Sequence, residues 1–238
     1  MKDLLLRWLS ALPASCAICA RWPARPVCDG CRQRHGSCLP RCPGCALPLA
    51  PGLSRCSRCA EAGPTALSHC LARFDYAHPW SGLVARLKRD PAWAGSLATL
   101  LAETPGLTER LEQTDLVLPI PLSPDRLRER GYNQAWELVK ALRRELRQLP
   151  PAQAGLLQRR PQNRAQHELP REQRIAHAMQ AYFVGSDRAR LQGKRVLLLD
   201  DVMTTGATLQ SAAAVLRDAG AAEVSALVLA RTPAPTLD

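Results

Sequence analysis

Hydrophobic residues in this chain form two kinds of run. Residues 196–199 (V-L-L-L) are too few for a helix with its own apolar face, and they suit a strand that is buried on both sides. Further strands are predicted at 69–76, 115–120 and 224–230. Apolar residues at helical spacing predict helices over 80–88, 93–101, 134–149 and 209–216. The pattern of strands and helices predicts an α/β fold.

The chain has 238 residues, enough for one α/β domain of ordinary size and a small accessory module. Residues 1–13 begin with an apolar stretch that Arg7 interrupts and Pro13 ends, which fits a short amphipathic helix better than a signal peptide. No apolar run approaches the ~20 residues of a membrane span. We therefore expect a cytoplasmic protein without membrane insertion.

The net charge of +11 favours polyanionic partners such as nucleic acids or diphosphate esters. Much of this charge lies between Arg126 and Arg174, a stretch with eleven arginines and Lys140 but only five glutamates. Two interpretations stay open for the stretch: a solvated basic surface, or a site that binds anions. Aromatic residues make up only 4% of the chain, which argues against extensive stacking of nucleic-acid bases.

Eight of the ten cysteines occur in four C-x-x-C pairs. The tight turn of such a pair places both thiolates on one metal ion, and two pairs complete a tetrahedral zinc site with no open coordination position. Pairing in sequence order predicts two structural sites, one from Cys16, Cys19, Cys28 and Cys31 and one from Cys42, Cys45, Cys56 and Cys59. Interleaved pairing is the alternative. A redox role suits a single pair but does not explain four.

The two remaining cysteines, Cys38 and Cys70, are predicted to be ordinary buried thiols. Six prolines between Pro23 and Pro51 leave little room for helices or strands in the cysteine-rich region. Metal is therefore expected to replace a hydrophobic core there.

The strand at 196–199 is followed by two carboxylates, Asp200 and Asp201, and then by a hydroxyl-rich turn into a helix. Free amides at a helix N-terminus form an anion site, and a glycine in the turn lets the backbone approach the anion closely. The carboxylates can accept hydrogen bonds from vicinal sugar hydroxyls. The sequence thus predicts a cradle for a sugar phosphate, whose turn residues are Thr204, Thr205, Gly206, Ala207 and Thr208.

Two other interpretations fit part of this stretch. An apolar run that ends in two aspartates also resembles the acidic strand of an ATPase, which needs a G-x-x-x-x-G-K-[ST] loop elsewhere. The pair Gly193-Lys194 is followed by Arg195 and precedes a strand, so it does not supply that loop. A purely structural turn with a helix N-cap would need neither two carboxylates nor three threonines.

A second basic turn follows the strand at 115–120. It ends in Arg130 and Gly131, and Asn133 and Gln134 are expected in the first turn of the next helix. A strand, a basic turn with glycine and a helix start again make an anion site. Such turns are common on their own, but together with the sugar-phosphate stretch this one suits a second, diphosphate arm of the same ligand.

These motifs together resemble known families. Residues 196–209 are similar to the phosphoribosyl diphosphate (PRPP) signature of the type I phosphoribosyltransferases. With the C-x-x-C pairs and the P-I-P…R-x-x-x-R-G-Y-N-Q-A turn, nearly the whole chain resembles the competence-protein ComF family and its relative linked to gluconate genes. The resemblance implies a double zinc ribbon at 14–62 and, at 66–238, a type I phosphoribosyltransferase fold with a parallel sheet. It also implies a link to DNA uptake in natural transformation.

For the site, the resemblance implies that Asp200 and Asp201 meet the ribose hydroxyls and that residues 204–208 hold the 5′-phosphate. The diphosphate side would be lined by Arg130, Gly131, Asn133 and Gln134. Magnesium would bridge the diphosphate and the ribose hydroxyls. Purine-salvage enzymes of this fold carry an acid at the position of Thr204, so purine salvage is not expected and the acceptor stays open.

The segment 157–183 resembles the family pattern Q-x-x-L…R-x-x-N…A-F through Gln166, Leu169, Arg174, Ala181 and Phe183, with His177 in place of the asparagine. We predict a loop here that closes over the ligand. Two classes of function stay open. One is phosphoribosyl transfer to an unknown acceptor. The other is a non-catalytic module that senses PRPP or associates with single-stranded DNA or a competence helicase. The sequence predicts no oligomeric state.

Overall fold

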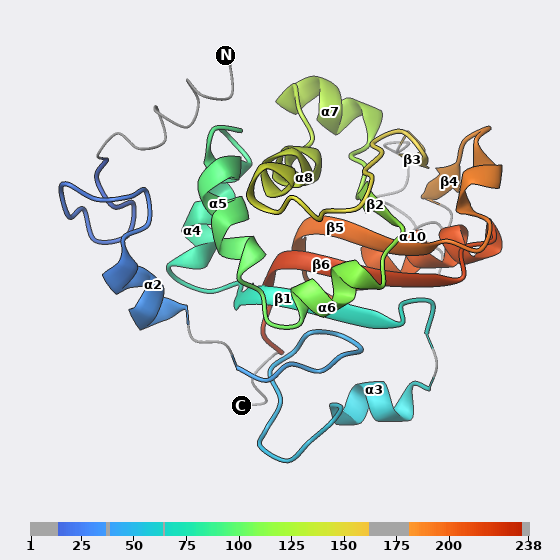
Figure 1. Ribbon diagram of the computed structural model, residues 1–238, viewed down its shortest axis with the longest axis horizontal. Coiled ribbons are helices and arrows are strands. Elements are labelled where there is room, and N and C mark those ends of the chain that lie inside the picture. The colour runs from blue at the N-terminus through green and yellow to red at the C-terminus, as the bar shows by residue number, and fades with distance from the viewer. Residues whose placement is uncertain (1–13, 37–38, 64, 162–180, 235–238) are drawn as a thin grey trace, which may run out of the picture. The chain divides into compact units, whose positions relative to one another are not determined.

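The computed structural model describes residues 14–36, 39–63, 65–161 and 181–234 (Figure 1). The chain divides into two compact units, Met1–Cys38 and Leu39–Asp238. The first cysteine group belongs to the first unit, and the second group shares a unit with the sheet. The domain limits proposed from the sequence, 14–62 and 66–238, stay a prediction.

Several predicted features lie outside the described residues. They are the helix at 1–13, Cys38, Gln166, Leu169, Arg174 and His177.

Four parallel strands form the sheet in the order β1 (His69–Asp75), β6 (Glu223–Arg231), β5 (Arg195–Met203) and β2 (Leu116–Pro119). All four predicted strands are thus confirmed, and so is the parallel-sheet α/β class. Leu199 of β5 lies opposite Leu227 of β6 on one side and Pro119 of β2 on the other. Because the strands run in the same direction, their carboxyl ends meet at one edge, where ligands of open α/β sheets bind.

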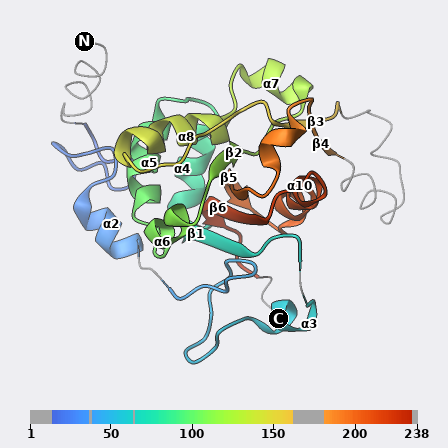
Figure 2. The same ribbon diagram turned by 45° about the vertical axis from the view of Figure 1, so that its right-hand side comes forward.

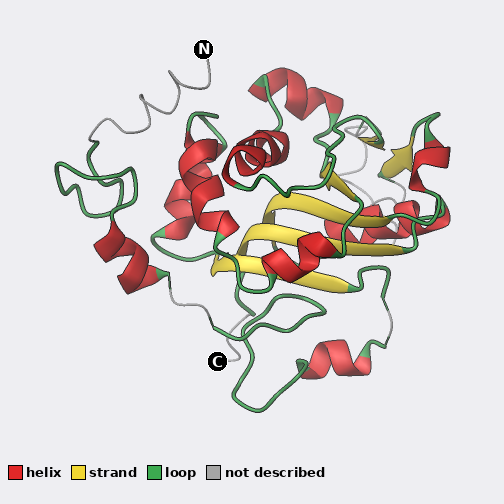
Figure 3. Ribbon diagram, in the orientation of Figure 1, coloured by secondary structure: helices red, strands yellow, loops and turns green. Residues whose placement is uncertain are grey.

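Helices cover both faces of the sheet (Figure 3). Figure 2 shows α5 and α8 on one face and α10 on the other. Among its described residues, the α-helices of this unit besides one in the cysteine-rich region are α4 (Trp80–Leu87), α5 (Trp93–Ala102), α6 (Leu107–Glu112), α7 (Pro124–Arg130), α8 (Gln134–Glu145) and α10 (Ala207–Asp218). None in the described part of the chain combines the length and hydrophobicity needed to cross a membrane. With both faces covered, the V-L-L-L run is buried at every position.

The outer edge of the sheet at β2 is covered by the segment 150–153. The amide of Val117 donates to the carbonyl of Pro151 at 2.9 Å, and the amide of Gln153 donates to the carbonyl of Val117 at 3.1 Å. The chain continues into an antiparallel pair, β3 (Leu157–Arg159) and β4 (Tyr182–Val184), and the short helix η2 (Arg188–Leu191) then leads to β5. Occupied backbone groups on β2 block pairing with another chain.

Several elements of the sheet unit differ from the sequence prediction: the helix predicted over 134–149 ends at Glu145, and α6, β3 and β4 were not predicted. β5 does not stop before the acid pair but continues to Met203, because β6 stays in register with it as far as Arg231. The basic turn after β2 is largely the helix α7. Ser123 caps this helix, Pro124 occupies its first position, and Gly131, with φ at +79°, ends it.

The cysteine-rich region contains two short helices that the prolines had argued against. They are α2 (Asp29–His35) and α3 (Ser57–Glu61). Each begins directly after a cysteine of a C-x-x-C pair, Cys28 or Cys56, which adopts extended backbone angles at the helix N-cap. The prolines lie outside both helices, so they do not prevent them.

Candidate functional site

The acid pair of β5 is buried, with Asp200 at 8% and Asp201 at 4% exposure. The amide of Asp201 donates to Oδ1 of Asp200 at 2.8 Å, and the amide of Val202 donates to Oδ1 of Asp201 at 2.9 Å. Successive side chains of a strand point to opposite faces, so the two carboxylates meet different neighbours. These backbone hydrogen bonds fix both carboxylates near the carboxyl edge of the sheet.

Lys88, which directly follows α4, is the charged neighbour of Asp201. Its Nζ lies 3.3 Å from Oδ2 of Asp201, and its side chain is about one-third exposed. Although this contact is an ion pair, its geometry is not that of a hydrogen bond, and Oδ2 has no hydrogen-bond partner among the described residues. Lys88 was not singled out from the sequence. A sequence feature that could have pointed to Lys88 is the rarity of lysine, which occurs at only four positions of this arginine-rich chain.

Asp200 lies on the other side, toward Tyr182 of β4. Burial, and next the charge of Asp201, hold the pKa of Asp200 well above its usual range, while Lys88 acts in the opposite direction. Burial also raises the pKa of Tyr182, with a further contribution from the charge of Asp200. The hydroxyl of Tyr182 forms no hydrogen bond of normal geometry within the described part of the chain, but the side chain of Thr208 in the cradle acts to lower its pKa. Buried groups with perturbed pKa values are typical of functional sites.

The predicted phosphate cradle follows the acid pair. Thr204 and Thr205 are exposed, and Gly206 adopts a left-handed conformation with φ at +87° before α10 begins. A side chain at this glycine would meet the Cε atom of Met203 at 2.6 Å and would be strained in any case. The exposed Ala207 and Thr208 form the first turn of α10. All five predicted residues therefore stand at a helix N-terminus, where backbone amides and the helix dipole favour an anion.

The second predicted loop joins α7 to α8. Asn133 caps α8 with its side-chain oxygen, and its Nδ2 donates to the carbonyl of Ile120 at 2.9 Å. Nη1 of Arg130 donates to Oε1 of Gln134 at 2.6 Å, so this arginine is held against the helix start. The sequence prediction placed Asn133 inside the helix. It is the cap because its short side chain can accept hydrogen bonds from the first amides.

The structure brings the two loops to the same edge of the sheet. The amide of Ile120, just after β2, donates to the carbonyl of Leu199 in β5 at 2.9 Å. The hydroxyl of Tyr132, in the second loop, donates to the carbonyl of Leu87 at 2.7 Å, and the next residue is Lys88, which contacts the acid pair. The end of α4 therefore connects the second loop with Asp201.

The cysteines gather in the two groups that pairing in sequence order predicts, namely Cys16, Cys19, Cys28 and Cys31, and Cys42, Cys45, Cys56 and Cys59. In each group the ligand atoms lie within 4.8 Å of one another. The interleaved alternative is therefore wrong. The Sγ atoms of Cys19 and Cys28 are 3.7 Å apart, and those of Cys45 and Cys56 are 3.6 Å apart. Tetrahedral zinc with Zn–S bonds of about 2.3 Å puts its sulfurs about 3.8 Å apart, so both groups fit zinc.

The two groups hold thiols of both kinds: burial raises the pKa values of Cys31, Cys45 and Cys59, whereas one thiol in each group has a lowered pKa that suits metal binding. Burial acts to raise the pKa values, but hydrogen bonds from backbone amides lower the pKa of Cys16 to about 6 and that of Cys42 to about 7. The amide of Cys28 donates to Sγ of Cys16, and the amide of Cys56 donates to Sγ of Cys42, each at 3.4 Å. Such hydrogen bonds stabilise the thiolate form that binds metal. Cys70 is buried outside both groups, as predicted.

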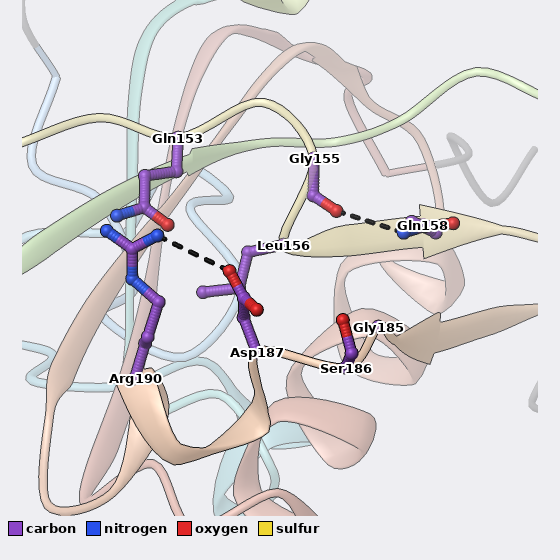
Figure 4. Close-up of a pocket in the computed structure, with 8 residues that line it drawn as sticks. All are labelled: Gln153, Gly155, Leu156, Gln158, Gly185, Ser186, Asp187 and Arg190. Atoms are coloured by element: carbon purple, nitrogen blue, oxygen red, sulfur yellow. Dashed lines mark hydrogen bonds and ion pairs between the residues drawn. The ribbon is translucent and has the colours of Figure 1, made fainter.

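A pocket elsewhere contains none of the predicted site residues. Its volume is about 480 Å³, and it lies between the β3–β4 pair and η2 (Figure 4). Its charged groups, Asp187 and Arg190, pair with each other at 3.5 Å, and Nε2 of Gln158 donates to the carbonyl of Gly155 at 3.2 Å. These three side chains thus have partners, whereas Oδ2 of Asp201 in the acid pair is buried without a hydrogen bond among the described residues. The acid pair is the better candidate for ligand chemistry.

Comparison with known proteins agrees with this geometry. The sequence profile described as the phosphoribosyl transferase domain matches residues 147–238, which include the acid pair and the phosphate cradle. Competence protein F of Haemophilus influenzae is 32% identical over 161 residues, an alignment that covers 66% of this chain and 69% of that protein. The chain belongs to the ComF family.

Two further proteins match a smaller share of this ComF-family chain. Competence protein ComFC of Streptococcus pneumoniae is 37% identical over 112 residues, and the alignment spans less than half of either protein, 47% of this chain and 46% of the relative. A purine phosphoribosyltransferase from Pyrococcus horikoshii matches 62% of this chain and 79% of its own, with 20% identity and a TM-score of 0.37. The family expected from the sequence is confirmed by the relative from Haemophilus influenzae, and the fold class by the parallel sheet and the matching domain profile.

Proposed function

We propose that this ComF-family protein binds PRPP with magnesium at the carboxyl edge of β5 and β2 and transfers its phosphoribosyl group to an acceptor. The observation that carries the proposal is the buried acid pair next to an exposed helix N-terminus. Burying two adjacent carboxylates is unfavourable for the fold, and a ligand with vicinal hydroxyls is one that would use them.

In this proposal each part of the edge serves one part of the ligand. Residues 204–208 hold the 5′-phosphate, and the acid pair holds the ribose hydroxyls. The diphosphate lies toward the loop that joins α7 to α8, where Arg130 and Gln134 form one hydrogen-bonded unit. The adjacency of the two loops supports this assignment, since Ile120 and Leu199 are joined by a backbone hydrogen bond.

Residues at the edge also fit magnesium. Oδ2 of Asp201 is a buried carboxylate oxygen without a hydrogen bond among the described residues, and hard cations prefer oxygen ligands. Bound magnesium would supply charge neutralisation for the departing diphosphate. Lys88 adds a positive charge beside the same carboxylate.

In the transfer step, the bond from ribose C1 to the diphosphate breaks, a bond to the acceptor forms, and the proton that the acceptor loses passes to the departing diphosphate or to water. Arg130 stabilises the departing negative charge, and the carboxylate of Asp201 stabilises the developing positive charge on ribose. Thr204 supplies no general base, so an acceptor that is already nucleophilic suits this site. The acceptor itself is an open part of the proposal.

We propose that the protein serves DNA uptake in competence, because its relatives are named competence proteins. A non-catalytic role in handling single-stranded DNA is the second candidate. The observation that favours it is α7, on which Arg126, Leu127 and Arg128 are all exposed. Arg128 is paired with Asp125 at 2.6 Å, so Arg126 is the better candidate for contact with a phosphate backbone.

Calorimetric titration of the zinc-loaded protein with PRPP and magnesium tests the proposal. We expect binding by the natural protein and its loss in the double variant Asp200→Asn/Asp201→Asn, which keeps the size of both side chains. Thermal unfolding checks that the variant is folded. Equal PRPP affinity in both proteins would reject the site. An assay of diphosphate release with candidate acceptors then separates an enzyme from a PRPP sensor.

A further inference from the structure

One buried side chain lies between the second cysteine group and the phosphate cradle. Arg231, the last residue of β6, is only 3% exposed. Its Nε donates to the carbonyl of Cys45 at 2.7 Å. Its Nη1 donates to the carbonyls of Met203 at 3.2 Å and of Thr204, and to that of Thr232 at 2.6 Å. One guanidinium therefore joins the metal-binding turn of Cys45 to the backbone at the start of the cradle.

The charge of Arg231 has no carboxylate counterpart in residues 14–36, 39–63, 65–161 and 181–234. By contrast Arg73, also buried at 6% exposure, lies 3.5 Å from the carboxylate of Glu103. A buried positive charge without a partner is strongly unfavourable. Zinc bound by four thiolates carries net negative charge, because the thiolates outweigh the dication. The second zinc site would thus provide the missing opposite charge.

The contacts around Arg231 can transmit a movement of the cysteine turn to the phosphate cradle. The amide of Thr232 donates to the carbonyl of Met203 at 3.0 Å, so this carbonyl is held from two sides. The amide of Cys70 in β1 donates to the carbonyl of Pro43 at 2.7 Å, which fixes the metal-binding turn to the sheet. Cys42, Cys45, Met203 and other buried residues belong to one hydrophobic cluster. Movement of the cysteine turn therefore reaches the cradle through short, buried contacts.

We propose that Arg231 is a positioning residue that couples zinc at Cys42, Cys45, Cys56 and Cys59 to the phosphate cradle, so that this zinc strengthens PRPP binding. The proposal rests on the proposed PRPP function. Loss of this zinc leaves the guanidinium without an opposite charge and releases the carbonyls of Met203 and Thr204, and the amides after Gly206 then lose their fixed orientation.

Coupling of this kind is reciprocal. If zinc at the second site strengthens PRPP binding by a given factor, PRPP must strengthen zinc binding there by the same factor. Couplings between sites are typically about 5-fold to 150-fold. Zinc affinity therefore gives a measurement that does not depend on transferase activity.

The test uses the full chain carrying Cys31→Ser, which disables the first cysteine group so that only the second site is reported. Zinc affinity is measured by equilibrium competition with a chelator, with and without PRPP and magnesium, and PRPP affinity is measured by calorimetry. Arg231→Lys keeps the charge and removes the forked donor, and Arg231→Met removes both. The matched control is Arg73→Lys, a change of another buried arginine.

With Arg231 present, we expect PRPP to raise zinc affinity at least about fivefold. Arg231→Lys should weaken PRPP binding by a similar factor and abolish most of the zinc effect, while Arg73→Lys should change either affinity by less than about twofold. Should Arg231→Met fail to fold, Arg231→Lys still decides the question.

Two negative results are distinguishable. If the protein with Arg231 binds PRPP and loses binding with Asp200→Asn/Asp201→Asn, but PRPP leaves zinc affinity unchanged, the coupling is rejected and the PRPP function stands. If it binds no PRPP at all, both proposals fail.

Discussion

The two cysteine groups share one motif and nearly the same spacing of sulfurs, but they differ in what surrounds them. The first group lies in residues 14–36, where Cys19 is exposed and the nearby Trp22 is 62% exposed. The other three cysteines of the first group are buried, and in the second group two are buried and two half-buried, so burial alone does not separate the groups. What separates them is that Cys42, Cys45 and the next residue, Ala46, belong to the hydrophobic cluster of the sheet unit. The same metal-binding turn can therefore be a local staple in one place and part of a domain core in another.

The difference arises from contacts that the C-x-x-C pattern does not contain. Nη1 of Arg41, just before the second group, donates to the carbonyl of Ala46 at 3.0 Å and to Asp75 at the end of β1 at 2.8 Å. Arg231 adds its hydrogen bond to Cys45. The second group thus shares its framework with β1, β5 and β6, and its metal is expected to matter for the ligand site.

The largest expected effect is on the stability of the sheet unit. Cys59→Ser should lower the free energy of unfolding of Leu39–Asp238 by about 4 kcal/mol, because it removes a ligand from a metal site that packs against the core, and loss of a metal is among the most damaging changes. The matched variant Cys31→Ser should change this unit by less than about 0.5 kcal/mol. Hydrogen exchange resolved by peptide measures the two units separately. Similar losses of protection in β5 and β6 for both variants would remove the distinction between the groups.

Sequence reasoning predicted those parts of the molecule that depend on local pattern. The V-L-L-L run and the cradle stretch were predicted from local pattern, whereas spacing along the chain left the cysteine pairing open between sequence order and interleaving until the structure decided it. Lys88 and Arg231 were missed because their roles depend on neighbours that are far away in sequence, Asp201 and Cys45. The length of β5 was missed for the same reason, since its last residues are held by pairing with β6.

The next effect concerns the arginines of the second loop. Arg130→Ala should weaken PRPP binding roughly tenfold to a hundredfold, because it removes a charge-assisted donor held at the site by Gln134. Arg126→Ala, on the exposed side of α7, should change PRPP affinity by less than about twofold. Calorimetry with PRPP compares the two variants.

The same pair of variants sharpens the contrast with nucleic-acid binding. A single-stranded DNA backbone would depend on both arginines, and the salt slope of binding would fall by roughly 0.7 for each phosphate that the variant no longer neutralises. Small and equal effects on PRPP, together with lower salt slopes for both variants, would favour the DNA-binding alternative over the transferase.

A smaller effect on stability is expected for a substitution in the acid pair. It should stabilise the fold, whereas Cys59→Ser should destabilise it. The pKa of Asp200 is raised in the folded protein, so the folded state binds this proton more tightly than the unfolded state, and ionisation lowers stability as the pH rises. Asp200→Asn should therefore raise the free energy of unfolding at pH 7, because the variant removes a buried charge that the folded state disfavours.

The pH dependence provides the control for this variant. Below the usual pKa of an aspartate, about 4, both proteins carry an uncharged group at this position, and their stabilities should converge. Denaturant unfolding at several pH values in magnesium-free buffer measures the difference. A variant that is less stable at pH 7 would show that Asp200 supports the fold rather than the ligand.

Hydrogen exchange of the natural protein with and without PRPP and magnesium tests the central claim most directly, because one experiment reports on the site and on both cysteine groups. We predict slower exchange in residues 196–209, in residues 130–135 and around the second cysteine group, with no change in residues 14–36. Unchanged exchange in residues 196–209, or equal protection of both cysteine groups, would contradict it.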